Sequence, residues 1–380
     1  MVGYLANPRC DRSREYSDAE RAILSFAAGA AAAAEITAWP GYRPTPLVRL
    51  PLLARALGVG DVLLKDEGAR FGLGSFKALG GAYAVRRLLA RERAGDVVVT
   101  CATDGNHGRA VAWGAQRFGC RAVIYLHAGV SEARERAIAA YGAQIVRTTG
   151  NYDDSVRQSA DDARRNGWFI ISDTSWPGYE DIPRDVMQGY TLMVREALAP
   201  IAAADFPTHI FIQGGVGAVA AAVLSHLWEG LGPLRPVVIV VEPDRADCLF
   251  RSAEAGRPVA VTGKLDTIMA GLACGEPSLL AWRILDRGAD AFLRITDEWA
   301  VEAMRRLAAP HAGDIAVVAG ESGAAGLAGL LALQSRPDLA RRAGLGAASR
   351  VLAFNTEGAT DPGLYRQIVG RSWQEVALGS

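Results

Sequence analysis

The chain lacks an excess of charge of either sign. Its 380 residues carry 41 lysine and arginine side chains against 41 aspartate and glutamate side chains, so the formal net charge is 0 at pH 7. Proteins that bind nucleic acid usually show a basic excess or patch, so no nucleic-acid partner is expected. Half of the residues are hydrophobic, which is ample for a buried core, and at about 150 residues per domain the length favours two domains.

Cysteine is scarce, and its spacing suggests no pairing. The five cysteines are an odd number, and none stands in a CxxC pair. This pattern indicates neither a disulfide scaffold nor a zinc knuckle, and no metal site is expected. Free thiols are typical of a reducing compartment, so we expect a cytoplasmic protein, although a pairing of Cys248 with Cys274 stays open.

Long hydrophobic runs are missing as well. Residues 1–4 show no basic segment leading into an apolar one, so no secretory signal is expected. The longest apolar run near the start, residues 23–34, is alanine-rich and shorter than the roughly 20 residues that span a bilayer. It predicts a helix of a soluble protein with no membrane partner.

Short apolar runs alternate along the chain with amphipathic segments. Apolar runs without polar alternation are typical of parallel strands that are covered on both faces. Amphipathic segments 131–141 and 185–198 are long enough to be crossover helices, and two prolines favour an extended segment at 42–47. The pattern predicts an α/β fold. Its expected strands are residues 62–65, 96–100, 121–126, 144–148, 168–171, 209–212, 236–241 and 350–354.

Lysine is rare, with only three against many arginines, and Lys77 has an unusual setting among glycines and apolar residues. An amine can act as a nucleophile, which a guanidinium group cannot. Burial among apolar neighbours would lower the pKa of this amine. A helix-start lysine that points to solvent is the alternative. Lys65 and Lys264 stand beside acidic residues and are expected at the surface.

Two further segments join a predicted strand to a predicted helix. In residues 100–109 a glycine-containing turn carries Asp104, which is expected either to cap the helix or to act as an acid or base, and His107, which is expected to bond to the backbone. In residues 213–220 successive glycines expose N–H groups at a helix N-terminus, which suits a phosphate. NAD is disfavoured, because the spacing is not the full G-x-G-x-x-G and Glu242 lies farther along than the usual acidic residue.

Several more segments accompany these three: residues 42–47, 70–73, 151–154, 173–179, 182–183, 187–190, 240–243 and 355–358. Together they resemble the fold type II enzymes that use pyridoxal 5′-phosphate, in the tryptophan synthase β-like superfamily. Within it, the chain is similar to the diaminopropionate ammonia-lyase family from about residue 40 to 370. The resemblance implies two open, twisted, mostly parallel sheets flanked by helices, with the cofactor in the cleft between domains. It also implies a large domain of residues 1–83 and 193–380, a small domain of residues 84–192, and a homodimer.

The resemblance also implies roles for single residues. Lys77 would form the internal aldimine, Asn106 would contact the 3′-oxygen of the pyridine ring, and Thr356 would bond to the ring nitrogen. The phosphate would be held by Gly214, Gly215, Val216 and Gly217.

The implied reaction is α,β-elimination of D- and L-2,3-diaminopropionate to pyruvate and two ammonia molecules. Asp104 is expected to take the α-proton of the D-isomer. Freed Lys77 or Asp173 would take that of the L-isomer, and Asp173 could also hold the leaving ammonium. Related serine and threonine dehydratases usually have a small residue where Asp104 stands.

Two departures from the family pattern bear on the substrate. Gly74 and Ser75 stand where Asn and Ala are expected, and Ala359 stands where an acidic residue is familiar. A serine or threonine dehydratase, or another β-eliminating enzyme, is therefore the alternative activity. The alternative from another class is an amino-acid sensor that binds pyridoxal phosphate without turnover.

Overall fold

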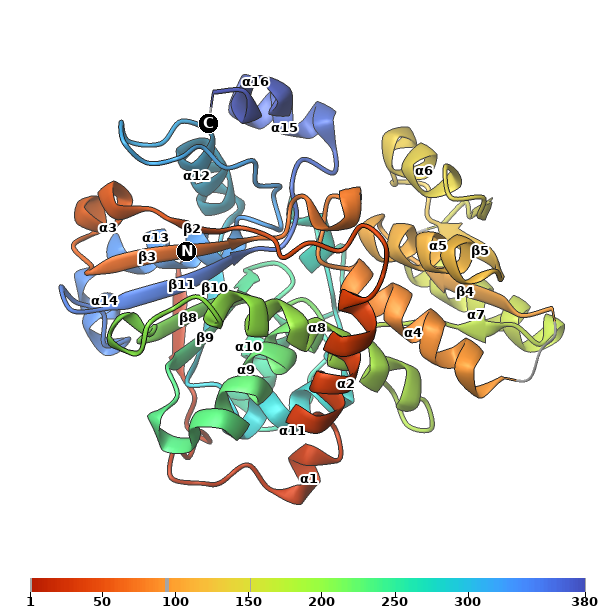
Figure 1. The fold of residues 1–380 in the computed structure, drawn as a ribbon, viewed down its shortest axis with the longest axis horizontal. Helices are drawn as coiled ribbons and strands as arrows, with labels where there is room; N and C mark the ends of the chain where they lie inside the picture. Colours follow the sequence, from red (N-terminus) through yellow and green to blue (C-terminus); the bar gives the residue numbers. More distant parts are fainter. Residues whose placement is uncertain (1, 93–95, 151, 380) are drawn as a thin grey trace.

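The computed structural model describes residues 2–92, 96–150 and 152–379, and within them the strands form a seven-stranded and a four-stranded sheet (Figure 1). The strands are β1 (Gly3–Ala6), β2 (Leu47–Arg49), β3 (Asp61–Asp66), β4 (Val98–Ala102), β5 (Arg121–Leu126), β6 (Gln144–Arg147), β7 (Phe169–Ile170), β8 (His209–Gln213), β9 (Val237–Pro243), β10 (Ala291–Ile295) and β11 (Arg350–Asn355). The helices of the first half are α1 (Asp18–Arg21), α2 (Phe26–Thr37), α3 (Pro51–Leu57), α4 (Ala78–Arg91), α5 (Asn106–Phe118), α6 (Glu132–Ala139), α7 (Tyr152–Asn166) and α8 (Asp181–Leu198). Those of the second half are α9 (Ala218–Leu231), α10 (Cys248–Ala255), α11 (Leu279–Gly288), α12 (Asp297–Ala308), α13 (Ala325–Gln334), α14 (Pro337–Arg342), α15 (Pro362–Val369) and α16 (Trp373–Ala377).

The larger sheet has the strand order β1-β10-β9-β8-β11-β3-β2. The five strands from β10 to β3 are parallel, while the edge strands β1 and β2 pair antiparallel. In the centre, Ile210 pairs with Val238 on one side and with Leu352 on the other, and all three side chains are fully buried. Helices on both faces bury these runs, which explains why they are apolar without alternation. Because the strands are parallel, β3, β8 and β11 end at the same edge of the sheet.

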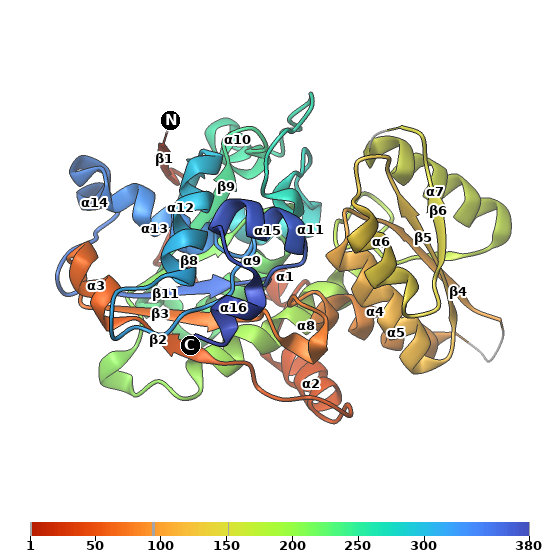
Figure 2. The ribbon, with the colours of Figure 1, turned by 90° about the horizontal axis from the view of Figure 1, so that it is seen from above.

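The smaller sheet has the order β6-β5-β4-β7 and is parallel throughout. Figure 2 shows it with α5, α6 and α7 as a body that stands apart from the larger sheet. The central strand β4 ends at Ala102, so the turn that follows it lies at the carboxyl edge of this sheet.

Helices α4 and α8 pack against each other beside the larger sheet. Their close approach depends on Gly189, where an added Cβ would collide with the carbonyl group of Leu79. The expected domain boundaries after residues 83 and 192 fall inside these two helices, so the division into domains remains a proposal.

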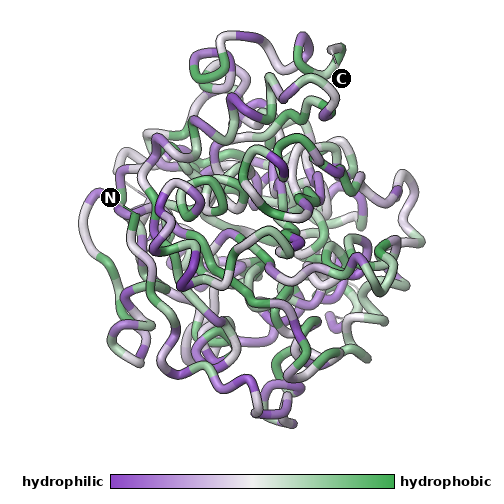
Figure 3. The backbone as a smooth tube through the Cα atoms, turned by 90° about the vertical axis from the view of Figure 1, so that its left-hand side faces the viewer, coloured by the Kyte–Doolittle hydropathy of each residue, from purple (hydrophilic) through white to green (hydrophobic). Residues whose placement is uncertain are grey.

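The α/β prediction is confirmed, and each expected strand overlaps an observed one. Strand β10, a short run that carries Arg294, and both antiparallel edge strands are not predicted from the sequence. The helix expected at 185–198 begins at Asp181 instead, and Pro183 lies in its first turn, where a proline is tolerated. Hydrophobic stretches cross the middle of the molecule (Figure 3), and no helix in the described residues is long and apolar enough to cross a membrane.

Candidate active site

Lys77 lies at the start of α4, directly after a glycine-rich loop. Its side chain is 19% exposed, and its Nζ lies 2.5 Å from Oδ2 of Asp173, which follows β7. The rings of Phe76 and Tyr190 flank the amine, with their centroids 5.3 and 5.9 Å from Nζ. The amine therefore points into the protein, and the alternative of a solvent-facing lysine is wrong.

The expected decrease in the pKa of Lys77 is also wrong for the free amine. Burial does act to lower the pKa, but the charge of Asp173 outweighs it and raises the pKa above its usual value. The reverse holds for Asp173, whose pKa is lowered because the attraction of Lys77 exceeds the cost of burial. The pair is charged, and sequence alone could not reveal the partner 96 positions away.

The loop that precedes Lys77 runs beside the loop that follows β11. Phe76 N–H donates to the carbonyl of Thr356 at 3.1 Å, and Gly358 N–H donates to the carbonyl of Gly74 at 2.9 Å. These bonds bring Thr356, which is buried, close to the start of α4. Two segments about 280 residues apart in the chain thus form one wall of the site.

The turn after β4 is shaped by Thr103 rather than by Asp104. The Thr103 hydroxyl accepts hydrogen bonds from the N–H groups of Gly105 and Gly108, at 3.0 and 3.1 Å. Gly105 has φ of 149°, a conformation that favours glycine. Asp104 makes no cap, so its carboxylate is available for another task.

The Asp104 carboxylate instead pairs with His127, which follows β5. Oδ1 of Asp104 lies 2.8 Å from Nε2 of His127, and the two side chains are 33% and 21% exposed. The ring of Tyr152 at the start of α7 stands perpendicular to the imidazole. His127 was not singled out from the sequence, because nothing near it in the chain marks it as a partner of Asp104.

The two polar side chains that follow Asp104 face opposite walls. Asn106 donates from Nδ2 to Oε2 of Glu357, a buried residue that also accepts from the N–H of Ser322 at 3.1 Å. His107 bonds through Nε2 to the carbonyl of Ile171 at 2.8 Å, as expected. Burial lowers the pKa of this imidazole, and its Nδ1 lies 4.0 Å from Asp173.

The glycine loop connects β8 to α9. Gly215 and Gly217 have φ of 58° and 95°, and the N–H groups of Gly215 and Val216 donate to no other residue that the structure describes. Glu242 accepts from the N–H groups of Leu249 and Phe250 at 2.9 and 2.7 Å. It is fully buried, and burial raises its pKa to about 8, so it is not placed to bind a ribose.

A pair of serines connects the glycine loop to the loop that carries Asp173. Ser278 donates its N–H to the carbonyl of Val216 at 2.9 Å, and its hydroxyl lies 2.8 Å from that of Ser175. Both serines are buried. Sequence reasoning missed them because isolated serines carry no recognisable motif.

The prediction that Lys65 lies at the surface is wrong, whereas Lys264 is exposed. Lys65 is fully buried, and its Nζ lies 2.7 Å from Glu196 on α8. Arg70 bonds to both Glu67 and Glu196 at 2.7 Å. This buried network of two cations and two carboxylates supports the loop before Lys77.

Cys248 and Cys274 are both free thiols, so the possible pairing is not present. Burial raises the pKa of each thiol. The described part of the chain holds no group of three or more His, Cys, Asp or Glu side chains that could hold a metal ion. Of the family segment at 151–154, Asn151 lies outside the described residues.

A family profile described as pyridoxal-phosphate dependent enzyme matches residues 38–357. Diaminopropionate ammonia-lyase of Escherichia coli (strain K12) is 43% identical over 357 residues, which cover 89% of this chain and 90% of that protein. The chain belongs to the diaminopropionate ammonia-lyase family. Its fold is that of the fold type II enzymes, and its cofactor is pyridoxal 5′-phosphate.

Solved structures of this family match nearly the whole chain. The holo diaminopropionate ammonia lyase from Escherichia coli has a TM-score of 0.91 and 38% identity, with 99% of this chain and 97% of that chain covered. The same enzyme in complex with an aminoacrylate-PLP azomethine reaction intermediate has a TM-score of 0.89 and 39% identity over the same shares.

The residues of this ammonia-lyase family member fit the cofactor. A phosphate needs several N–H donors, and Gly215 and Val216 provide unpaired ones near the N-terminus of α9. A Cβ built on Gly215 would find its nearest neighbour 3.6 Å away, so there is open space at this position, whereas a Cβ on Gly214 would meet Cγ of Glu242 at 2.7 Å. Nδ1 of His107 is buried without a hydrogen-bond partner among the described residues, which fits a site that receives a polar ligand.

Proposed function

We propose that this chain catalyses the α,β-elimination of D- and L-2,3-diaminopropionate to pyruvate and two molecules of ammonia. The observation that carries the proposal is the 2.5 Å contact between Lys77 and Asp173. It places an amine that can hold the cofactor beside a carboxylate that can hold a cationic leaving group. Serine and threonine lose a hydroxyl group instead and need no such anionic partner.

The cofactor would be held by this chain's residues as follows. Lys77 Nζ would make the covalent bond, Asn106 would donate to the 3′-oxygen, and the Thr356 hydroxyl would bond to the ring nitrogen. Of the loop residues Gly214, Gly215, Val216 and Gly217, the N–H groups of Gly215 and Val216 would bind the phosphate, because those of Gly214 and Gly217 already donate to the carbonyl groups of Val241 and Gly214. Bound pyridoxal phosphate supplies an electron sink for the charge that remains when the α-proton leaves.

Proton transfer would be divided between the two faces of the substrate. Asp104 takes the α-proton of the D-isomer at a carboxylate oxygen. Freed Lys77 Nζ or Asp173 takes the α-proton of the L-isomer from the other face. Asp173 also stabilises the departing ammonium, because opposite charges attract strongly in a partly desolvated site.

The organisation of the whole protein is part of the same proposal. A large domain of residues 1–83 and 193–380 and a small domain of residues 84–192 would enclose the cofactor. Such domains commonly close when substrate binds. The protein would act as a homodimer in the cytoplasm, where its five free cysteines would stay reduced.

A substrate panel tests this proposal. Purified protein with pyridoxal phosphate is assayed for pyruvate with D- and L-diaminopropionate, D- and L-serine, and L-threonine. We expect both diaminopropionate isomers to exceed the hydroxy amino acids in kcat/KM by about a hundredfold, the effect of one well-placed charge in a desolvated site. A preference for serine or threonine would indicate a dehydratase, and no turnover of any amino acid would indicate a sensor.

A further inference from the structure

His127 is a histidine with a fixed orientation beside a proposed base. Its Nε2 lies 2.8 Å from Oδ1 of Asp104, and its Nδ1 accepts a hydrogen bond from the N–H of Gly129 at 3.1 Å. A backbone N–H can only donate, so Nδ1 must be the unprotonated nitrogen of the neutral ring. The proton of the neutral ring is therefore on Nε2, where it points at Asp104.

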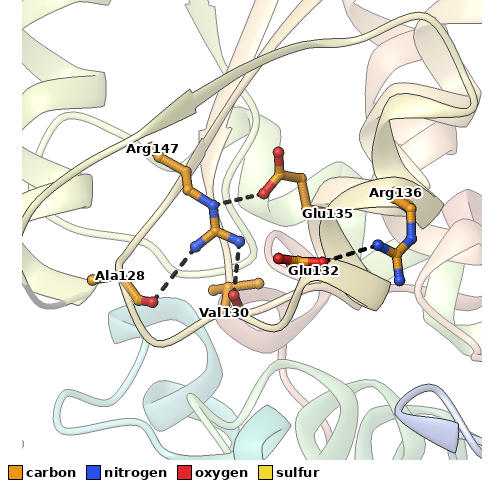
Figure 4. Close-up of a pocket in the computed structure, with 6 residues that line it drawn as sticks. All are labelled: Ala128, Val130, Glu132, Glu135, Arg136 and Arg147. Atoms are coloured by element: carbon orange, nitrogen blue, oxygen red, sulfur yellow. Dashed lines mark hydrogen bonds and ion pairs between the residues drawn. The ribbon is translucent and has the colours of Figure 1, made fainter.

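The loop that carries His127 is held in place from a neighbouring strand. Arg147 on β6 donates to the carbonyl groups of Val130 at 2.8 Å and of Ala128 at 3.5 Å, and it pairs with Glu135 at 2.6 Å (Figure 4). The same guanidinium group lies 3.5 Å from the carbonyl of His127. The hydrogen bonds from Arg147 thus hold the loop in a conformation that places the imidazole next to Asp104.

Three elements place charged or titratable groups around this pair. Arg134 on α6 donates to the carbonyl of Asp104 at 3.4 Å, and Tyr152 on α7 stands over the imidazole. Arg147 comes from β6 and Glu135 from α6, and these two neutralise each other. His127 is the group that bonds directly to the Asp104 carboxylate, whose Oδ2 makes no hydrogen bond to another described residue.

We propose that His127 is a positioning residue that holds the Asp104 carboxylate by one oxygen and leaves the other free to meet the substrate. This inference rests on the proposed function, because it takes Asp104 as the base for the D-isomer. A fixed donor on one oxygen selects a single rotamer of the carboxylate. The α-proton of the L-isomer would be removed from the other face, so its turnover would not depend on His127.

A pair of substitutions separates this role from mere packing. His127→Leu removes the donor at similar size, whereas His127→Gln keeps an N–H group within reach of Asp104. We expect His127→Leu to lower kcat/KM for the D-isomer about tenfold, with the L-isomer changed less than about twofold. His127→Gln should restore most of the lost kcat/KM for the D-isomer.

The exposed His311→Leu is the matched control and should change neither isomer. Equal losses for both isomers in His127→Leu, or no recovery in His127→Gln, would overturn the positioning role. Those results would leave the proposed function intact if the wild type still turns over diaminopropionate. Failure of the wild type on both isomers would remove the proposed function first, and the positioning role with it.

Proton NMR of the holoenzyme measures the pairing without turnover. We expect a downfield imidazole N–H signal that is missing in His127→Leu and moves upfield in Asp104→Ala. A signal that does not respond to Asp104→Ala would refute the pairing, whatever the kinetics show.

Discussion

Asp104 and Asp173 carry the same side chain in opposite surroundings. Asp173 faces a lysine amine and a buried imidazole, and the pKa of its carboxyl is well below its usual range. Asp104 lies in a more exposed turn, and its direct partner is an imidazole that donates to it. Equal residue types can therefore perform different proton transfers, because the partners differ.

This difference leads to a prediction about stereochemistry. Asp104→Asn should lower kcat/KM for D-diaminopropionate by about a hundredfold or more, since an amide cannot take a proton. The L-isomer should lose less than about fivefold, because its proton leaves from the other face. Pyruvate formation from each pure isomer measures this, with the exposed Asp161→Asn as control. Similar losses for both isomers would contradict the assignment of Asp104 to the α-proton of the D-isomer alone.

At this scale, sequence reasoning succeeded where a motif surrounds the residue and failed where only a distant contact defines it. Lys77 stands out among glycines, and the structure turns it inward toward Asp173. Lys65 stands beside Asp66 and looks like a surface residue, yet its partner Glu196 is 131 positions away. No local sequence signal marks His127 or Ser278 as part of the site, because their partners are also distant in the chain. Pairwise tertiary contacts cannot be read from one sequence.

At the scale of elements, the loop before Lys77 is anchored by buried charges. Arg70 bonds to Glu67 near the end of β3 and to Glu196 on α8, and both pairs are almost free of solvent. The two carboxylates are matched by two cations, so no charge in this cluster is left uncompensated. The network fixes the direction in which the chain enters α4.

Removing the Arg70 charge from this buried network should therefore lower the stability of the protein. Arg70→Met is expected to lower the free energy of unfolding by about 3 kcal/mol, because it leaves a buried negative charge unpaired. Arg121→Met is the matched control, since its pair with Asp96 is exposed and should contribute little. Chemical denaturation of the holoenzyme checks both variants. Equal effects of the two substitutions would show that burial does not set the strength of these pairs.

Another contact joins α6 to the loop that precedes α13. Arg134 lies 2.8 Å from Glu321, so it connects elements that belong to the two proposed domains. Burial, together with the negative charge of Glu357, raises the pKa of Glu321 from 4.5 to about 7, although Arg134 opposes the shift. The native state thus disfavours the charged form of Glu321.

This shift predicts a pH-dependent effect of Glu321→Gln. The folded protein binds more protons than the unfolded chain between pH 4.5 and about 7, so the contribution of Glu321 to stability is present at low pH and decreases as the pH rises. The variant cannot ionise and avoids this loss. Its Tm relative to the wild type should therefore be higher at pH 8 than at pH 5. A difference in Tm that does not change with pH would refute the assignment.

At the scale of the whole molecule, the sheet architecture was predictable and its edges were not. Strands β8, β9 and β11 are buried on both faces, so their apolar runs mark them clearly. Strand β10 carries an arginine, and β2 is only three residues long, so neither gives a strong local signal. The order of the strands in each sheet depends on crossover connections along the whole chain. The local periodicity of the sequence carries no information about that order.

The central claim is that Lys77 holds pyridoxal phosphate in a site that eliminates diaminopropionate. The most direct measurement is the visible spectrum of the purified protein with the cofactor, before and after addition of D-diaminopropionate, with Lys77→Ala beside it and Lys264→Ala as the control. We predict a visible band in the wild type and in Lys264→Ala that changes on addition of substrate as pyruvate appears, and no such band of covalently bound cofactor in Lys77→Ala. A wild-type protein that stays colourless, or an undiminished band in Lys77→Ala, would contradict the account.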